Sequence, residues 1–229
     1  IKILDFTTIV MGPASTRILS DCGAEVIKIE SSSRSDTLRS ATPYKGEDPS
    51  PNRSGYFAMY NAGKLSLPIN MRNPESVNFV KEHLIPWADI VVTAFTPRVL
   101  PMWGMTYDDL AAIKPELIML SACLMGNTGP YADLRGTGQL AAALSGWYEN
   151  TGWPDKDPVG PYSAYADFVS WNYFIVAVMA ALDYRDRTGK GQYIDQSMFE
   201  STLQFAGPQL MYYLNEGKLT TRMGNQDVD

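Results

Sequence analysis

The first thirty residues, IKILDFTTIVMGPASTRILSDCGAEVIKIE (residues 1–30), decide the fold class of this chain. An apolar run at 1–6 precedes Gly12-Pro13, and a second apolar run occupies 25–30 after Gly23. Proline fits the first turn of a helix, and glycine commonly follows a helix end. This order of strand, helix and strand predicts a unit in which two parallel strands are joined by a helix.

The same alternation continues to about residue 123. A helix is expected after Asn73-Pro74, and Thr106 with Asp109 has the spacing of a capping box before another. Further strands are expected at 65–70, 89–94 and 117–123. Three of the five expected strands are almost wholly apolar, which is typical of strands covered on both faces. We therefore predict an α/β fold: a doubly wound, Rossmann-like, mostly parallel sheet with helices on both faces.

From about residue 139 the pattern becomes helical. We expect a short helix at 140–144, a long apolar helix at 168–187, and a helix at 196–215 that is interrupted near Gly207-Pro208. A possible short strand lies at 193–194. We expect residues 1–195 to form one large domain, and residues 196–229 to form a helical linker towards a second domain that is largely absent from this chain.

Composition excludes several classes of protein. The chain has 229 residues, of which 45% are hydrophobic and 19% are charged, an ordinary balance for a globular protein. The net charge of -6 argues against nucleic acid as a partner. The longest uncharged apolar run, 168–182, falls short of the ~20 residues that a membrane span needs, so we expect no membrane partner.

The scarce residues limit the chemistry. His83 is the sole histidine, and Cys22 and Cys123 are the only cysteines, which leaves too few ligands for a zinc site built from several such residues. Two distant cysteines indicate a reducing compartment, and we expect the protein to be cytoplasmic. Neither GxGxxG nor GxxxxGK[ST] is present. Catalysis must then rest on carboxylates, Lys, Arg, Tyr and backbone amides.

Asp167 is the carboxylate in the most suggestive setting, directly before the long apolar helix. An Asp at this position usually caps the helix. A helix start also stabilises an anion, so we expect this carboxylate to stay ionised in an apolar site. An ionised, poorly solvated carboxylate can attack an acyl carbon.

At this point a family resemblance becomes visible, carried by motifs that follow one another along the whole chain. The matching pieces are 3–7 with Gly12-Pro13, GAEVIKIE at 23–30, Asp36 with Arg39, NAGK at 61–64, ADIVV at 88–92, GNTGP at 126–130, and TGKGQ at 188–192 followed by Asp195, Ser197 and Glu200. In this order they resemble the N-terminal part of the class III CoA-transferases, the family of formyl-CoA transferase and the carnitine CoA-transferases.

The resemblance implies a reaction as well as a fold. It places Asp167 as a nucleophile that attacks a donor acyl-CoA to give a mixed anhydride and then an aspartyl-CoA thioester, from which CoA passes to an acceptor carboxylic acid. It implies coenzyme A as a thioester substrate, and neither a permanently bound cofactor nor a metal. It also implies an interlocked homodimer, or a heterodimer with a paralogue.

The resemblance further implies that Arg39 and Lys64 line the CoA site, and Arg98 is a weaker candidate. Two positions depart from formyl-CoA transferase: Val10 stands where that enzyme has glutamine and Ala94 where it has asparagine, which argues against formate or oxalate as substrate. Aromatic residues around Asp167 favour a bulky or apolar acyl group. They are Tyr162, Tyr165, Phe168, Trp171 and Tyr173.

Two other functions remain open. An α-methylacyl-CoA racemase shares the fold but uses a His–Asp pair, and its histidine would fall close to Thr137, far along the chain from His83. A non-catalytic partner subunit is the second alternative. The presence of Asp167, Arg39 and Lys64 argues against it.

Overall fold

The computed structural model describes residues 1–31, 33, 35–47 and 49–226. Its described part contains one sheet of six strands in the order β3-β2-β1-β4-β5-β6, and every neighbouring pair is parallel. The strands are β1 (Lys2–Asp5), β2 (Glu25–Glu30), β3 (Leu65–Pro68), β4 (Ile90–Thr93), β5 (Ile118–Cys123) and β6 (Gln192–Ser197). The predicted doubly wound α/β fold is confirmed.

The last strand is longer than its sequence indicates. β6 pairs with β5 along its whole length, with Leu120 opposite Ile194 and Cys123 opposite Ser197. It lies at the edge of the sheet, which explains why it is more polar than the central strands. The domain boundary predicted at residue 195 falls inside β6, so the sheet continues two residues beyond it.

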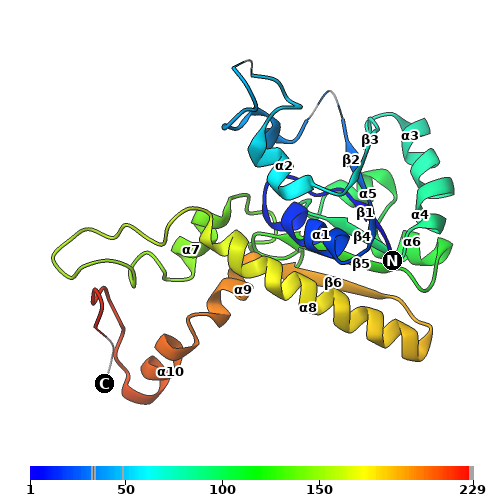
Figure 1. The fold of residues 1–229 in the computed structure, drawn as a ribbon. Coiled ribbons are helices and arrows are strands. Elements are labelled where there is room, and N and C mark those ends of the chain that lie inside the picture. The colour runs from blue at the N-terminus through cyan, green and yellow to red at the C-terminus, as the bar shows by residue number, and fades with distance from the viewer. Residues whose placement is uncertain (32, 34, 48, 227–229) are drawn as a thin grey trace.

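Alternate strand residues face two separate apolar cores. Ile3 packs in a core with Phe174 and Val178 of α8 (Tyr165–Thr188), whereas its neighbour Leu4 packs in the other core with Ile85. The first core is covered by α8, α1 (Met11–Asp21) and α7 (Gly138–Leu144). The second is covered by α3 (Pro74–Phe79), α4 (Ile85–Trp87) and α6 (Tyr107–Ile113) (Figure 1).

The remaining helices lie around this sandwich. A 3₁₀ helix at Thr37–Ser40 and α2 (Gly55–Asn61) follow β2, and α5 (Val99–Trp103) follows β4. α9 (Met198–Gln204) packs on α7 and α8. Figure 1 shows α10 (Gly207–Glu216) and the loop after α7 projecting away from the sheet. The break between α9 and α10 lies where Gly207-Pro208 predicts it.

Several helix ends form as the sequence predicts. The Asn73 side chain accepts a hydrogen bond from the Glu75 amide, and Thr106 with Asp109 makes a full capping box. The helix after Asn73 is not regular, however: it contains a wider π-type turn at Val80–Leu84. Pro86 follows directly and has no N–H to give to the preceding turn, which explains the irregular hydrogen bonding.

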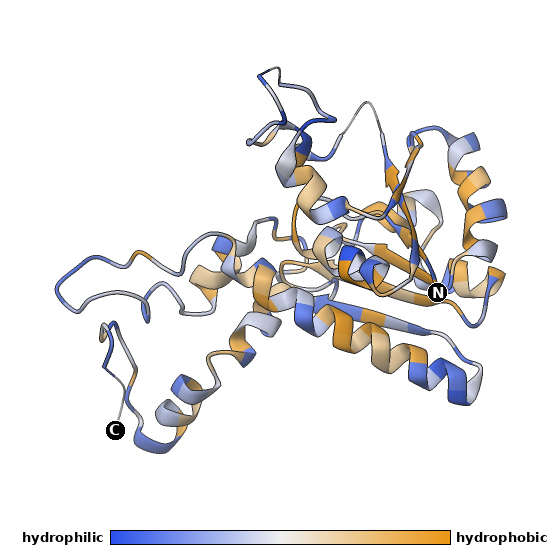
Figure 2. Cartoon of the chain, viewed as in Figure 1, coloured by the Kyte–Doolittle hydropathy of each residue, from blue (hydrophilic) through white to orange (hydrophobic). Residues whose placement is uncertain are grey.

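α8 begins earlier than the expected residue 168, and Figure 2 shows its mixture of apolar and polar residues along the sheet. By length and composition it is the one helix in the described chain that could cross a membrane. Its buried face includes Phe174, Val178 and Ala181, all packed in the first core. A core helix of a folded domain passes the same test.

The two faces of α8 give a direct test of this packing. Phe174→Ala is expected to lower the free energy of unfolding by about 3–5 kcal/mol, because Phe174 is fully buried in the core. Val176→Ala is the matched control, since Val176 is 66% exposed and should change stability by less than about 0.5 kcal/mol. Urea unfolding measures both. Equal losses would show that this face of α8 does not contact the sheet.

Candidate active site

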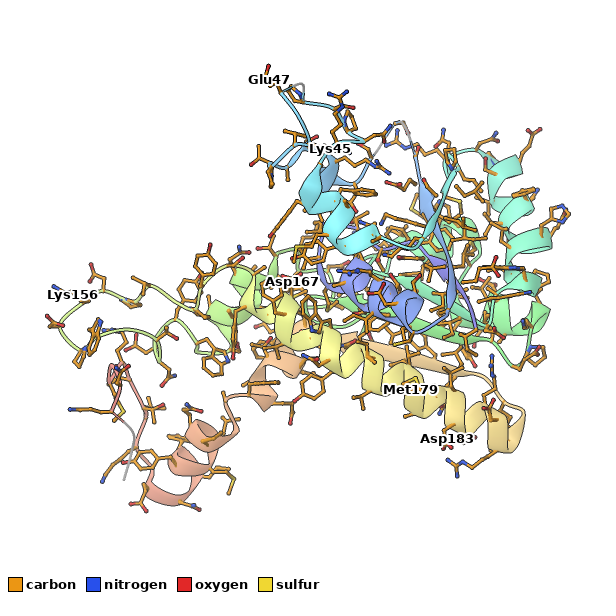
Figure 3. The ribbon with its side chains drawn as sticks, in the orientation of Figure 1. Lys45, Glu47, Lys156, Asp167, Met179 and Asp183 are labelled. Atoms are coloured by element: carbon orange, nitrogen blue, oxygen red, sulfur yellow. The ribbon has the colours of Figure 1, made fainter. Side chains whose placement is uncertain are left out.

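Asp167 lies in the first turn of α8, beside α1 and α2 (Figure 3). The residue at the cap position is Ala164, whose side chain makes no capping bond, so the prediction that Asp167 caps the helix is wrong. The helix starts one turn earlier than its apolar run because Tyr165 and Ala166 also pack against the core. Asp167 is therefore inside the helix, and only 6% of it is exposed.

Backbone amides from other elements face the Asp167 carboxylate. The Met11 amide, at the start of α1, donates to Oδ1 at 3.3 Å. The Gly138 amide, at the start of α7, lies close to this carboxylate and also favours its charge. A Cβ added to Gly138 would lie 1.9 Å from Oδ2, so only glycine lets the two elements approach this closely. The position of these two amides beside Asp167 could not be predicted from the sequence, because backbone groups carry no sequence signature beyond the small residue at 138.

Burial raises the pKa of the Asp167 carboxyl to about 6, and the amides of Met11 and Gly138 offset only part of this effect. The expected influence of the helix start, which would keep the carboxyl fully ionised, is thus outweighed by loss of solvent. At neutral pH the group is still mostly ionised. The site holds a carboxylate that is poorly solvated and partly stabilised, which favours nucleophilic reactivity.

Aromatic side chains form the walls near Asp167. Phe168 packs edge-to-face on Trp171, and both contact the small cluster that includes Val10 and the buried Tyr60. Burial, the neighbouring Tyr56 and the charge of Asp167 raise the pKa of Tyr60 to about 12. Tyr60 was not anticipated from the sequence.

The five aromatic residues predicted to crowd the nucleophile are not all gathered there. Tyr165 packs against Trp147 in a tilted arrangement. Tyr173 instead packs against Phe205, and Tyr162 is 95% exposed. The apolar wall is therefore smaller than the sequence suggests.

A cavity of about 330 Å³ opens at the carboxyl ends of the strands β1 to β4. In doubly wound folds this edge of the sheet is where ligands bind. Arg72, which follows β3, is the cation among the described residues that line the cavity, and it had not been singled out from the sequence. The other lining residues are Phe6, Thr8, Ile9, Ile29, Glu30, Ser31, Ser33, Ser35, Asp36, Thr37, Ile69, Asn70, Met71, Ala94, Phe95 and Trp103.

The turn between β1 and α1 separates the cavity from Asp167. Thr8 and Ile9 line the cavity, and the amide of Met11, two residues further, donates to Asp167. A single short segment therefore contacts both places.

Arg39 lies beside the cavity and is already paired. Its guanidinium donates to both oxygens of Glu30, with Nε–Oε1 at 2.9 Å and Nη2–Oε2 at 2.5 Å, and it stacks on the Phe57 ring. Hydrogen bonding to Glu30 raises the pKa of Arg39. Glu30 itself lines the cavity, so Arg39 neutralises a negative charge there.

Lys64 has a different environment from the one expected of a phosphate ligand. Its side chain is 2% exposed, and its Nζ donates to Asp5 at 3.0 Å, to the Pro13 carbonyl at 2.9 Å and to Asn61 at 3.0 Å. Burial opposes ionisation of Asp5, but Lys64 and Lys28 hold the pKa of that carboxyl well below its ordinary value. All three ammonium protons of Lys64 are used inside the protein.

Arg98, in the loop after β4, is exposed and forms an ion pair with Asp133, with Nη2–Oδ2 at 2.6 Å. It lies three residues beyond Phe95, which lines the cavity. Both cysteines are free, as expected. Burial raises the pKa of the Cys123 thiol to about 11, so it is protonated near neutral pH.

Comparison with known proteins places this geometry in a family. The family model described as CoA-transferase family III matches residues 1–229. The chain belongs to this family. The resemblance inferred from the motifs is confirmed, and the chain spans about half the length of the curated relatives that it matches.

Named relatives transfer CoA between carboxylic acids. The chain is 36% identical to an acetyl-CoA:oxalate CoA-transferase of Acetobacter aceti, over 98% of this chain and 56% of that protein. It is 34% identical to a human succinyl-CoA:glutarate CoA-transferase, over 98% of this chain and 50% of that protein. The crystal structure of a CAIB/BAIF family protein from Brucella suis superposes with a TM-score of 0.91, at 36% identity, over 98% of this chain and 59% of that one.

The raised pKa of Asp167 predicts how stability depends on pH. The folded pKa of about 6 exceeds the ordinary value of 3.8, so this group favours folding below about pH 4 and loses that contribution as pH rises to about 6. Asp167→Asn removes the charge that burial penalises. At about pH 7.5 it should raise the free energy of unfolding by about 2 kcal/mol.

Urea unfolding of both proteins across this pH range measures the effect. The difference should fall towards zero at about pH 4, where Asp167 is protonated and resembles the amide. A stability difference that stays constant from about pH 4 to 8 would contradict a raised pKa at this position.

Proposed function

We propose that this chain supplies the CoA-binding domain and the nucleophile of an acyl-CoA:carboxylate CoA-transferase. The observation that carries the proposal is the buried Asp167 carboxylate, which faces the amides of Met11 and Gly138. Membership of the family adds that relatives of known activity transfer CoA. Asp167 lies next to the turn that lines the cavity at the strand ends.

The proposed reaction begins when an Asp167 oxygen attacks the carbonyl carbon of a donor acyl-CoA. The carbon–sulfur bond breaks, CoA leaves as a thiolate, and a mixed anhydride remains on Asp167. The thiolate then attacks the aspartyl carbonyl and releases the donor carboxylate. The acceptor carboxylate displaces CoA from this thioester to form a second anhydride, and the thiolate finally attacks the acceptor's carbonyl, which frees Asp167.

The environment of Asp167 suits these steps. A carboxylate stripped of water attacks more readily than a solvated one, and each thioester formed has an energy close to that of the thioester consumed. The walls of Phe168, Trp171 and Tyr60 restrict water, which would hydrolyse the anhydrides. The protein's own part is to hold the carboxylate, the thioester and the amide donors together.

We propose that the cavity at the strand ends holds the nucleotide part of CoA. Arg72 supplies a cation for a phosphate, and hydroxyls of Ser31, Ser33 and Thr37 supply donors. In this proposal Arg39 neutralises the charge of Glu30 at the cavity wall. Arg98 lies near the cavity, in the loop beyond Phe95, and is paired with Asp133. Lys64 stabilises the β1–α1 turn through its bonds to Asp5 and to the Pro13 carbonyl.

The location, substrates, oligomeric state and domain organisation of the whole protein are part of the same proposal. We propose a cytoplasmic protein that works with a small-molecule acyl-CoA donor and a carboxylic acid acceptor, as an interlocked homodimer or with a paralogue. One relative is named as the beta subunit of a succinyl-CoA–L-malate CoA-transferase. Residues 1–195 would form the large domain, with residues 196–229 linking it to a second domain.

The named relatives define which acids to test first. Their names include acetyl, succinate and glutarate, and also oxalate, which Val10 and Ala94 argue against as a substrate of this chain. A racemase is disfavoured because His83 lies on the other face of the sheet, where it packs against Phe79 between Val80 and Leu84 of the second core. A non-catalytic subunit would lack reactivity at Asp167.

The aspartyl intermediate gives the decisive test of the chemistry. Full-length protein incubated with succinyl-CoA or acetyl-CoA and hydroxylamine, without acceptor acid, should acquire a hydroxamate on Asp167. Mass spectrometry of the peptide that contains residues 165–168 detects it. Asp167→Asn should abolish both the label and CoA transfer, because the amide is a much weaker nucleophile.

Cys123→Ala is the matched control, since this protonated thiol is the other potential acyl acceptor near the strand ends. It should keep full labelling. A label that survives Asp167→Asn, or disappears in Cys123→Ala, would refute the aspartyl route, and no label with any donor would favour the non-catalytic subunit.

Arg72 tests the location of CoA. Arg72→Ala should raise the KM for the donor by about tenfold or more and leave kcat nearly unchanged, because it removes a charge-assisted contact made equally before and during the reaction. Arg187→Ala is the control, since it removes an exposed cation paired with Asp183 at the far end of α8. Steady-state kinetics in full-length protein measure both, and equal KM values would place the nucleotide elsewhere.

A further inference from the structure

Four charged side chains are buried together around the turn between β1 and α1. Asp5, Lys28 and Asp36 are at most 2% exposed, and so is the side chain of Lys64. The two lysines balance the two carboxylates. Buried ion pairs seldom stabilise a protein more than apolar side chains of the same size would, so their geometry is the informative feature.

These charged side chains bind three backbone groups of the turn: the N–H and C=O of Thr7 and the N–H of Ile9. Asp5 Oδ1 accepts from the Thr7 amide at 2.8 Å, and Lys28 Nζ donates to the Thr7 carbonyl at 2.7 Å. Asp36 accepts from the Ile9 amide, with both carboxylate oxygens at 3.2 Å. Lys28 also pairs with Asp36 at 3.4 Å, which links the last two contacts.

The backbone conformation of Ile9 depends on such contacts. Its φ angle is +71°, a left-handed conformation that a β-branched residue adopts only when its surroundings impose it. Two residues later, the Met11 amide donates to Asp167 at 3.3 Å. The direction of that amide is therefore set by a backbone conformation that the chain would not choose alone.

We propose that Asp36, held by Lys28, is a positioning residue for the reaction at Asp167: it keeps Ile9 in the left-handed conformation and so aims the Met11 amide at the nucleophile. This inference rests on the proposed function. Asp36 makes no hydrogen bond to Asp167, so this effect passes through the turn. Asp36 also accepts from the Leu38 amide at 3.0 Å, which caps Thr37–Ser40, and it lines the cavity; KM for the donor is therefore measured beside kcat.

The surroundings of Asp167 make its titration a suitable readout. The charge on Asp167 is opposed by burial and favoured by the amides of Met11, Gly138 and its own residue. The other titratable group that senses it is Tyr60 of α2. Loss of the Met11 contact should therefore weaken ionisation of Asp167, which a purely structural role of Asp36 would not do.

The experiment compares two charge-neutral double variants in full-length protein. Lys28→Met with Asp36→Asn keeps an oxygen that can accept from the Ile9 amide. Lys28→Met with Asp36→Leu removes that acceptor and keeps the branched shape at Cγ, with two larger methyl groups in place of the oxygens. Arg185→Met is a control for the loss of a partly buried ion pair, since Arg185 binds Asp89 away from the turn.

Both double variants lose the Lys28–Thr7 contact, so the asparagine variant sets the reference kcat against which the leucine variant is measured. The leucine variant should lose about 10²-fold in kcat, because a misplaced group near the reacting atoms has effects of that size. Its acid limb in the pH profile of kcat should move up by about one pH unit, as expected for one hydrogen bond to a charged group. Ile9→Gly in the leucine variant should restore much of kcat, since glycine adopts positive φ freely.

Each outcome decides between the alternatives. Wild-type kcat with an unshifted acid limb in the folded leucine variant would overturn the positioning role. If leucine prevents folding, Asp36→Ser takes its place: serine can still cap Thr37–Ser40, but its shorter side chain does not reach Ile9, and the same loss is expected. Activity that survives Asp167→Asn would instead overturn the proposed function, whatever the Asp36 variants do.

Discussion

The constraint on which this site depends is the burial of one carboxylate that has amides as its partners. Asp167 is nearly inaccessible, and the groups that stabilise its charge are the amides of Met11 and Gly138 with that of its own residue. Burial prevails, so the pKa rises to about 6. Amides have fixed directions and short reach, and the positions of three chain segments must therefore be accurate for the group to remain ionised at neutral pH.

The fold brings these segments together through its strand order. β1 and β4 lie side by side at the centre of the sheet, and the chain leaves β1 towards one face and β3 towards the other. A crevice forms where the connections diverge, at the carboxyl ends of these strands. The β1–α1 turn borders this crevice on one side and Asp167 on the other, so a single loop links the proposed CoA cavity to the nucleophile.

The periodicity and turn residues predicted all six strands, the last of them too short, and several helix ends, because these features depend on local chemistry. They also drew attention to Asp167. The role of Lys64 was not accessible in this way: whether its ammonium faces a ligand or Asp5 depends on how β3 pairs with β2 and β2 with β1. The start of α8 was misplaced for a similar reason, since Tyr165 and Ala166 join the helix through contacts with distant core residues.

The absence of a cation among the described partners of Asp167 has a chemical meaning in the proposed reaction. A lysine or arginine beside it would lower its pKa and its reactivity together. Amides stabilise the carboxylate only in part, and the same donors face the oxygen that becomes an oxyanion when the thiolate attacks the aspartyl carbonyl. The cations near the turn, Lys28 and Lys64, are instead paired with Asp36 and Asp5. These ion pairs thus fix the β1–α1 turn and its amide donors in place, while neither lysine is a partner of Asp167.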